Sequence, residues 1–62
     1  MNKSEIREVA KIAQYRAAGL GADFVARALS ALIRAARTNK SAAALRDLAA
    51  DWGVTDHPEF IC

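Results

Sequence analysis

The side chains best suited to acid–base or metal chemistry gather at the end of the chain. Asp56, His57, Glu59 and Cys62 lie within seven residues of one another. A zinc site needs several His or Cys ligands in short spacings such as CxxC, and a nucleophilic cysteine needs an oriented base and an oxyanion site. His57 is the only histidine and Cys62 the only cysteine. We therefore expect an exposed polar tail, no enzymatic activity, no metal and no cofactor.

A second candidate for chemistry is the pair of glycines in Gly19-Leu20-Gly21, since glycine-rich loops cradle phosphates. A phosphate-binding loop follows a strand and carries a Lys-Ser or Lys-Thr pair, and neither accompanies these glycines. The segment instead predicts a turn between two helices. We expect Gly19 to adopt the left-handed conformation that ends a helix, with Leu20 supplying the accompanying apolar contact.

The run 48–55, LAADWGVT, resembles the first helix and turn of a helix-turn-helix DNA-binding motif, in which L-A-x-x-x-G-V-[ST] leads into the recognition helix. The resemblance covers eight residues and implies a polar and basic helix after Thr55. The sequence instead offers Asp56 and Glu59 after Thr55, with no Lys or Arg. Because acidic groups are unfavourable against phosphates, a nucleic-acid-binding regulator stays the alternative and not the main interpretation.

The segment 22–37, ADFVARALSALIRAAR, is the helix that must position everything else. At about 100° per residue its polar side chains fall within a wedge of about 80°, and the large apolar side chains and alanines occupy about 220°. The wedge contains Asp23, Arg27, Ser30, Arg34 and Arg37. Since a surface helix normally has a narrower apolar stripe, this helix is predicted to lie between the other helices or against a partner.

The first helix is predicted to open at Asn2 or Ser4, where Asn2 and Glu5 have the spacing of a capping box. Its apolar stripe toward the second helix is predicted to consist of Ile6, Val9, Ala10, Ala13 and Ala17. Ile12 and Tyr15 fall outside this stripe, beside Glu8. They are therefore either residues at the edge of the core or part of a contact surface.

The third helix is predicted to run from Ser41, as N-cap, to Trp52. Its buried line is expected to be Leu45, Leu48 and Trp52, flanked by Ala44 and Ala49. Gly53 should cap this helix while Val54 packs back on it. The tail after Thr55 is predicted to form a short turn or helix anchored by Phe60 and Ile61.

A chain of 62 residues forms one domain, 1–62, and a core of this size supplies about 3–5 kcal/mol of net stability. A single cysteine cannot form an internal disulfide, so oligomerisation or a partner protein is the expected support. The sequence contains no apolar run of membrane-spanning length, and its charged start lacks the apolar segment of a signal peptide. We expect a cytoplasmic protein with no membrane association and no small-molecule substrate.

Charge is distributed unevenly along the chain. Through Lys40, eight basic and three acidic residues give +5, and from Ser41 onward one basic and four acidic residues give −3. Arg27, Arg34 and Arg37 form a basic ridge on the second helix. This ridge either keeps an apolar helix in solution or contacts phosphates or an acidic protein surface.

Together these patterns predict an all-α protein, a small three-helix bundle with a short C-terminal turn or helix. The expected function is to bind a protein partner, or a second copy of the chain, through apolar helix faces and so to modulate the partner's activity. The size and the alanine- and arginine-rich composition suit a phage or mobile-element accessory regulator. A purely structural homodimer or subunit is the remaining alternative. The candidate contact residues are Ile12, Tyr15, Phe24, Arg27, Leu32, Arg34 and Arg37.

Overall fold

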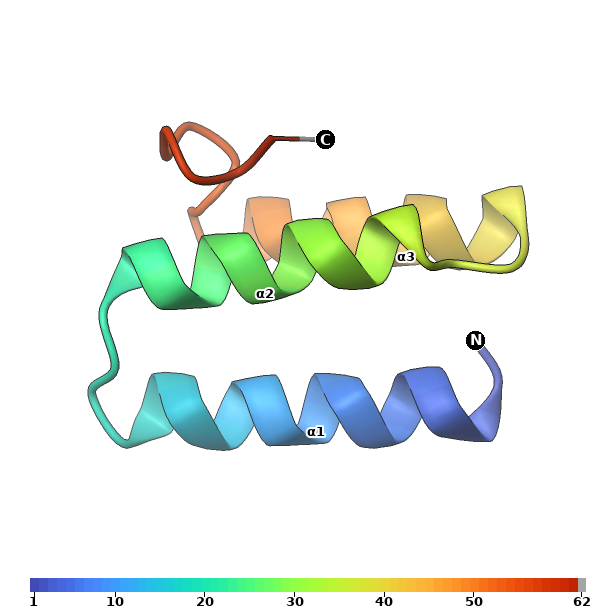
Figure 1. Ribbon diagram of the computed structural model, residues 1–62, viewed down its shortest axis with the longest axis horizontal. Coiled ribbons are helices and arrows are strands. Elements are labelled where there is room, and N and C mark those ends of the chain that lie inside the picture. Colours follow the sequence, from blue (N-terminus) through green and yellow to red (C-terminus); the bar gives the residue numbers. More distant parts are fainter. Residues whose placement is uncertain (62) are drawn as a thin grey trace.

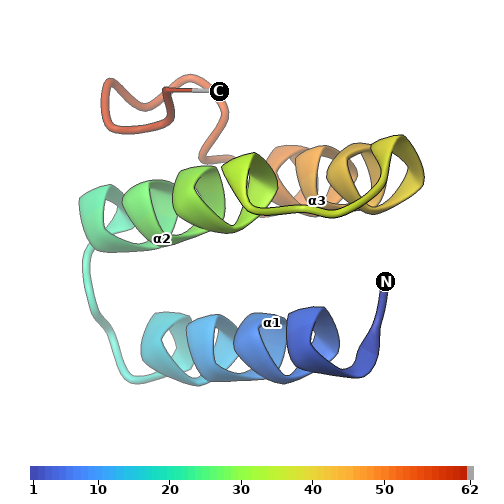
Figure 2. The same ribbon diagram turned by 45° about the vertical axis from the view of Figure 1, so that its right-hand side comes forward.

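The computed structural model describes residues 1–61, which fold into three helices and a non-helical tail (Figure 1). The helices are α1 (Lys3–Ala17), α2 (Ala22–Arg34) and α3 (Asn39–Asp51). The predicted all-α three-helix bundle is confirmed. Figures 1 and 2 show α2 between α1 and α3, with α2 running opposite to both, so the central place predicted for this helix is confirmed too. No helix in 1–61 is long and apolar enough to cross a membrane.

Both ends of α1 carry the capping interactions expected from the sequence. The Asn2 side chain accepts a hydrogen bond from the Glu5 backbone N–H at 2.8 Å, and Glu5 Oε1 accepts one from the Asn2 backbone N–H at 2.9 Å. At the other end, Gly19 has φ of 88°, a conformation that a side chain would strain. The Leu20 N–H closes this turn by donating to the Tyr15 carbonyl. The Leu20 side chain, predicted to supply an apolar contact at this turn, is 45% exposed.

The core lies mainly between α2, α3 and the turn that follows α3. Leu29 of α2 and Leu45 of α3 are completely buried. Gly53 ends α3 with φ of 71°, and Val54 then folds back with its N–H donating to the Ala49 carbonyl. Val54 is 3% exposed, so the predicted cap and the returning valine are both confirmed.

The face that α1 turns toward the bundle differs from the predicted stripe. The buried residues of α1 are Glu5 and Ile12, while Ile6 is 54% exposed. The prediction that Ile12 lies outside the packed stripe is therefore wrong. The reason is that Glu5 is buried by polar contacts: besides the Asn2 N–H, the Ser41 hydroxyl donates to Glu5 Oε1 at 3.1 Å. Hydrophobic periodicity counts a glutamate as an outward-facing residue and so rotates the predicted face away from Glu5.

The exposed wedge predicted for α2 is correct for Asp23, Arg27 and Arg34, which are exposed. It is wrong for Arg37, because the helix ends at Arg34, and for Ser30, which is completely buried. The tail covers this serine. The Ile61 backbone N–H donates to Ser30 Oγ at 3.0 Å, and the Ser30 hydroxyl reaches the Glu59 carbonyl at 3.5 Å. Among residues 52–61 the tail forms turns and no helix. Phe60 packs against the core as expected, but the Ile61 side chain is 60% exposed, so the backbone of this residue is what holds it.

Helix α3 begins two residues before the predicted N-cap. Thr38 is the N-cap, and its hydroxyl oxygen accepts a hydrogen bond from the Ser41 backbone N–H at 3.0 Å. Ser41 lies inside the first turn and is buried, because its hydroxyl is directed at Glu5. The buried face of α3 also differs from the predicted line of Leu45, Leu48 and Trp52. Leu45 and Ala49 are buried, Leu48 and Trp52 are half-buried, and Ala44 is exposed.

Candidate protein-binding groove

A groove of about 410 Å³ runs between α1 and α2. Both helices contribute a line of residues at alternating spacings of three and four, so each line stays on one helix face. From α1 come Glu8, Ile12 and Tyr15, with Lys11 beside them. From α2 come Phe24, Ala28 and Ala31, with Leu32 beside them, and the C-cap residue Ala35 continues the line. The groove is therefore a seam between two helices that its own chain leaves open.

An aromatic pair forms the end of the groove nearest the α1–α2 turn. The rings of Tyr15 and Phe24 meet edge to face, with centroids 5.5 Å apart and an interplanar angle of 87°. Although they pack on each other, Tyr15 is 39% exposed and Phe24 is 42% exposed. A T-shaped pair is a favourable arrangement of two rings, and it holds an apolar surface in place before any partner arrives.

The α2 wall of the groove is built from small side chains. Ala28, Ala31 and Ala35 project only a methyl group each, and Leu32 lies beside them. Small residues in line on a helix let a second helix approach closely, because no long side chain holds the two backbones apart. The small, apolar side chains of this wall therefore suit the close approach of a helix.

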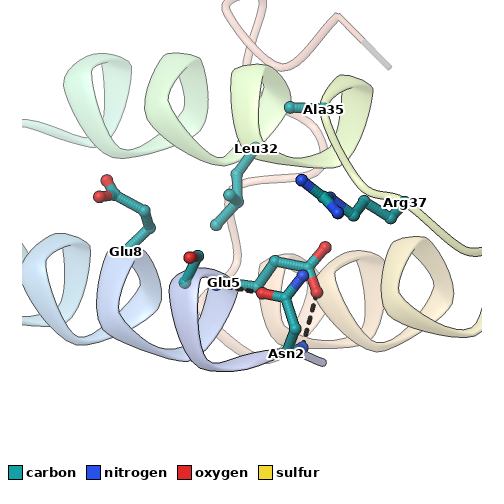
Figure 3. A pocket seen from close by; sticks show the side chains of 7 residues that line it. Asn2, Glu5, Glu8, Leu32, Ala35 and Arg37 are labelled. Atoms are coloured by element: carbon teal, nitrogen blue, oxygen red, sulfur yellow. Dashed lines mark hydrogen bonds between the residues drawn. The ribbon is translucent and has the colours of Figure 1, made fainter.

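The groove continues into a polar hollow of about 290 Å³ at the N-terminal end of α1 (Figure 3). Glu8, Leu32 and Ala35 line both spaces. The hollow adds Asn2, Ser4, Glu5 and Arg37. Figure 3 shows the Arg37 side chain reaching over the hollow from the segment that joins α2 to α3. One end of the seam is therefore aromatic and the other is polar.

The carboxylate of Glu5 lies almost completely buried at the base of this hollow. The residue is 6% exposed, Oε1 accepts hydrogen bonds from Asn2 and Ser41, and buried Oε2 has no hydrogen-bond partner. The Asn2 backbone N–H is the main cause that lowers the pKa of Glu5 below its ordinary value of 4.5. The Ser41 hydroxyl and the Arg37 backbone N–H act in the same direction, and burial opposes them. Glu5 is thus an ionised group that is held within its own chain.

The α1 rim of the groove carries one charge of each sign. Lys11 Nζ and Glu8 Oε1 are 3.7 Å apart, and the two side chains are 55% and 51% exposed. An exposed pair at this distance contributes little to the stability of its own helix. Both groups therefore remain available to charges on whatever enters the groove.

The structure brings together four of the seven contact residues expected from the sequence. Ile12, Tyr15, Phe24 and Leu32 all line the groove. The three arginines do not form one site: Arg37 lines the polar hollow, Arg34 is exposed and lines neither space, and Arg27 belongs to the tail contact.

Arg27 faces away from the groove, where its Nη2 donates to Glu59 Oε1 at 2.6 Å. This contact is the main cause that raises the pKa of Arg27 above its ordinary value. The remaining candidate chemistry of the tail has a structural use. His57 Nδ1 accepts a hydrogen bond from the Glu59 backbone N–H at 3.1 Å, which closes a turn. Cys62 lies outside the described residues.

Several groove residues were missed by the sequence reasoning. The alanine line of α2 and the two glutamates of α1 were not among the predicted contact residues, although Phe24, Ala28, Ala31 and Ala35 recur at the spacing of one helix face. This spacing could have identified the groove wall. It is easily overlooked, because alanine occurs at both exposed and buried positions. Comparison of the chain with models of protein families, with curated proteins and with solved structures finds no match.

Proposed function

We propose that this chain is a non-catalytic protein-binding module that receives a helix of another polypeptide in the α1–α2 groove and so modulates that polypeptide's activity. The observation that carries the proposal is the exposed edge-to-face pair of Tyr15 and Phe24 at the end of an alanine-lined seam. The chain has a single cysteine, which suits a reducing, cytoplasmic setting.

Binding in this groove has a clear physical basis. The exposed parts of the two rings and of the groove methyl groups would leave water on contact with an apolar helix face, and buried apolar area stabilises an interface by about 25 cal/mol per Å² before the costs of association. The rings are already packed on each other, so little side-chain freedom is lost when they are covered. An amphipathic helix that presents apolar residues at spacings of three and four fits this surface.

Site-specific photo-crosslinking in cells that naturally make the chain tests the proposal. A photoreactive phenylalanine derivative replaces Ala35, which is exposed at the junction of the groove and the polar hollow. The matched control carries the same group at Ala44, an exposed alanine on α3. We expect a defined adduct with one polypeptide from position 35 and none from position 44. Equal labelling from both positions, or no adduct from position 35, contradicts the proposal.

Nucleic-acid binding is a second candidate, because one end of the molecule collects exposed basic residues. Lys3 begins α1, Arg34 ends α2, and Arg37 and Lys40 lie around the start of α3. These three helix ends meet, since Asn2, Ser4 and Arg37 line one hollow and Glu5 contacts Ser41. The run that resembles a helix-turn-helix motif gives no support, because the described residues after it form turns instead of a recognition helix.

Binding to random duplex DNA at low salt separates the two candidates. A phosphate-contacting end predicts binding that falls steeply as salt rises, and its loss when Arg34 and Lys40, which line neither space, are both replaced by Glu. A groove-binding module predicts weak DNA binding in the native chain and an unchanged crosslink at position 35 in the doubly substituted chain. These two basic residues are then solubilising residues.

A further inference from the structure

The polar hollow at the end of the α1–α2 groove has basic residues on two of its borders. Arg37 reaches over it from the segment that joins α2 to α3 (Figure 3). On α1, Ser4 lines the hollow and Lys11 lines the groove. Arg7 follows Ser4 by three residues and precedes Lys11 by four, so it lies on the same helix face. Basic residues therefore border the open seam from α1 and from the α2–α3 segment.

Two of these border residues, Arg7 and Arg37, have exposed guanidinium groups that form no ion pair within the described part of the chain. Among residues 1–61 the ion pairs join Lys11 to Glu8 and Arg27 to Glu59. A guanidinium group binds a carboxylate through two parallel hydrogen bonds, which makes arginine well suited to acidic partners. Both groups are therefore available to carboxylates that arrive with a partner.

The acidic residues of the hollow are engaged elsewhere and do not neutralise the two arginines. Glu5 is 6% exposed, and its carboxylate accepts hydrogen bonds from Asn2 and Ser41. The carboxylate of Glu8 lies 3.7 Å from the Lys11 ammonium group. The borders of the hollow thus keep unmatched positive charge, while the adjoining groove keeps exposed apolar surface.

We infer that the helix received by the groove is acidic: its apolar stripe lies on the alanine wall, and glutamate or aspartate residues beside that stripe bind Arg7 and Arg37. The inference rests on the proposed function, since it gives the chemistry of the partner in the same groove. Residues that flank the apolar seam between two helices pair across it, so carboxylates at these positions of the partner meet the two basic borders. Such charge complementarity selects the partner and accelerates its association.

An acidic helix fits this surface better than a nucleic-acid backbone does. The groove beside the basic borders is lined by alanines and aromatic rings, and the hollow itself is lined by Glu5 and Glu8. A continuous row of phosphates would meet both of these carboxylates, which is unfavourable. An amphipathic helix can instead place its acidic side chains at the borders and its apolar side chains between them.

Binding of two synthetic peptides to the purified full chain tests the inference. Each peptide is about three heptads long and has the same stripe of leucine and alanine at spacings of three and four. One carries glutamate on both sides of the stripe, and the other carries glutamine at the same positions. We expect fluorescence anisotropy at low salt to show that the glutamate peptide binds about tenfold more tightly. This difference should shrink as the salt concentration rises to about 0.5 M, because salt screens exposed charges.

Removal of charge in pairs assigns the preference to the two arginines. Arg7→Gln combined with Arg37→Gln removes both guanidinium groups and keeps the Arg37 backbone N–H that acts on Glu5. The matched control, Arg34→Gln combined with Arg46→Gln, removes the same charge from exposed residues that line neither the groove nor the hollow. We expect the dissociation constant of the glutamate peptide to rise about tenfold in the first variant and less than about twofold in the control. Circular dichroism should show native helix content in both.

Four results would overturn the inference. They are equal binding of the two peptides, equal losses of binding in the two doubly substituted chains, no binding of the glutamate peptide up to about 1 mM, and displacement of that peptide by random duplex DNA at the same salt concentration. The last result would assign the two arginines to phosphates instead of to the carboxylates of a partner helix.

The outcomes separate this inference from the proposed function. If both peptides bind equally and the photoreactive group traps them at position 35 but not at position 44, the acidic partner is excluded and the protein-binding groove stands. If neither peptide binds and position 35 traps no polypeptide in cells, both fail. If the preference for glutamate is lost with the two arginines and position 35 gives a defined adduct in cells, both are supported.

Discussion

The two sides of α2 are packed to very different degrees. The side that faces α3 and the tail buries its apolar residues almost completely. Val25, Ala26 and Leu29 of α2 form one cluster with Ala49 of α3 and Val54, each at most 3% exposed, and Ile12 is the residue that α1 adds to it. On the side that faces α1, the aromatic residues Tyr15 and Phe24 remain more than a third exposed beside an open groove. One central helix therefore has one side that completes the fold and one side that does not.

This difference shows how a very small protein can keep a binding surface without losing its fold. The α3 side supplies the closely packed core, while α1 buries only Ile12 and the charged Glu5 among its side chains. Two contacts tie α1 to α3 at opposite ends, namely Glu5 with Ser41 and the Arg16 guanidinium 5.2 Å above the Trp52 ring. Helix α1 is thus positioned by a few directed contacts, and its remaining apolar surface stays available.

The comparison is tested most severely by truncating one apolar residue on each side. Leu29→Ala removes a completely buried side chain and should lower the free energy of unfolding by about 3 kcal/mol, close to the whole stability expected of such a chain. Phe24→Ala removes a side chain that is 42% exposed and should cost about 1 kcal/mol or less. Urea denaturation followed by circular dichroism measures both. Equal losses would mean that the α1 side is also part of the stabilising core.

The attachment of the tail to the packed side predicts the next largest effect. Ser30→Ala removes the acceptor of the Ile61 N–H and the donor to the Glu59 carbonyl, and it should destabilise the fold by about 1–2 kcal/mol. Hydrogen exchange of the Ile61 amide should become faster. Arg27→Gln is the control, since it weakens only the exposed contact with Glu59 and should leave the Ile61 amide protected. Unchanged exchange in Ser30→Ala would show that the tail is held by Phe60 alone.

The capping box on the open side predicts a smaller effect that depends on pH. Hydrogen bonds lower the pKa of Glu5 in the folded chain below its ordinary value of 4.5. The ionised carboxylate therefore stabilises the fold when the pH is above 4.5, and this contribution is lost as the pH falls below 4.5. The native chain should therefore lose more stability between pH 5 and about pH 2 than Glu5→Gln. Thermal unfolding over this range measures the difference. Parallel curves would exclude Glu5 as the source.

The three helices and most of their ends were predictable from the sequence, because helix patterns and helix caps depend on neighbouring residues. The polar and apolar arcs of 22–37, the capping pair of Asn2 and Glu5, and the helix-ending Gly19 and Gly53 are all carried by neighbouring residues. The errors involve polar side chains that distant segments bury. Ser30 is covered by the tail, and Glu5 is satisfied by Ser41, which is 36 residues away in sequence. Periodicity counts such residues as exposed, since it contains no information about long-range partners.

The candidate groove was predictable only in part. The large apolar residues Ile12, Tyr15, Phe24 and Leu32 stand out in the sequence, and they do meet in space. The polar hollow was not foreseen, because it depends on the packing of three helix ends against one another. The arginines were overvalued for a related reason. Equal spacing on a helix wheel does not show that the tail would engage Arg27 while Arg37 extends over the hollow.

The finest test of the comparison removes one oxygen atom from the open side. Tyr15→Phe keeps the edge-to-face ring pair, and the Tyr15 hydroxyl has no hydrogen-bond partner among the described residues, so the free energy of unfolding should not change. Urea denaturation of Tyr15→Phe beside the native chain measures this difference. Phe24→Ala is the comparison, because it removes the whole ring from the same pair and should cost about 1 kcal/mol or less. A loss of stability in Tyr15→Phe as large as the loss in Phe24→Ala would show that the hydroxyl, and not only the ring pair, holds the open side in place.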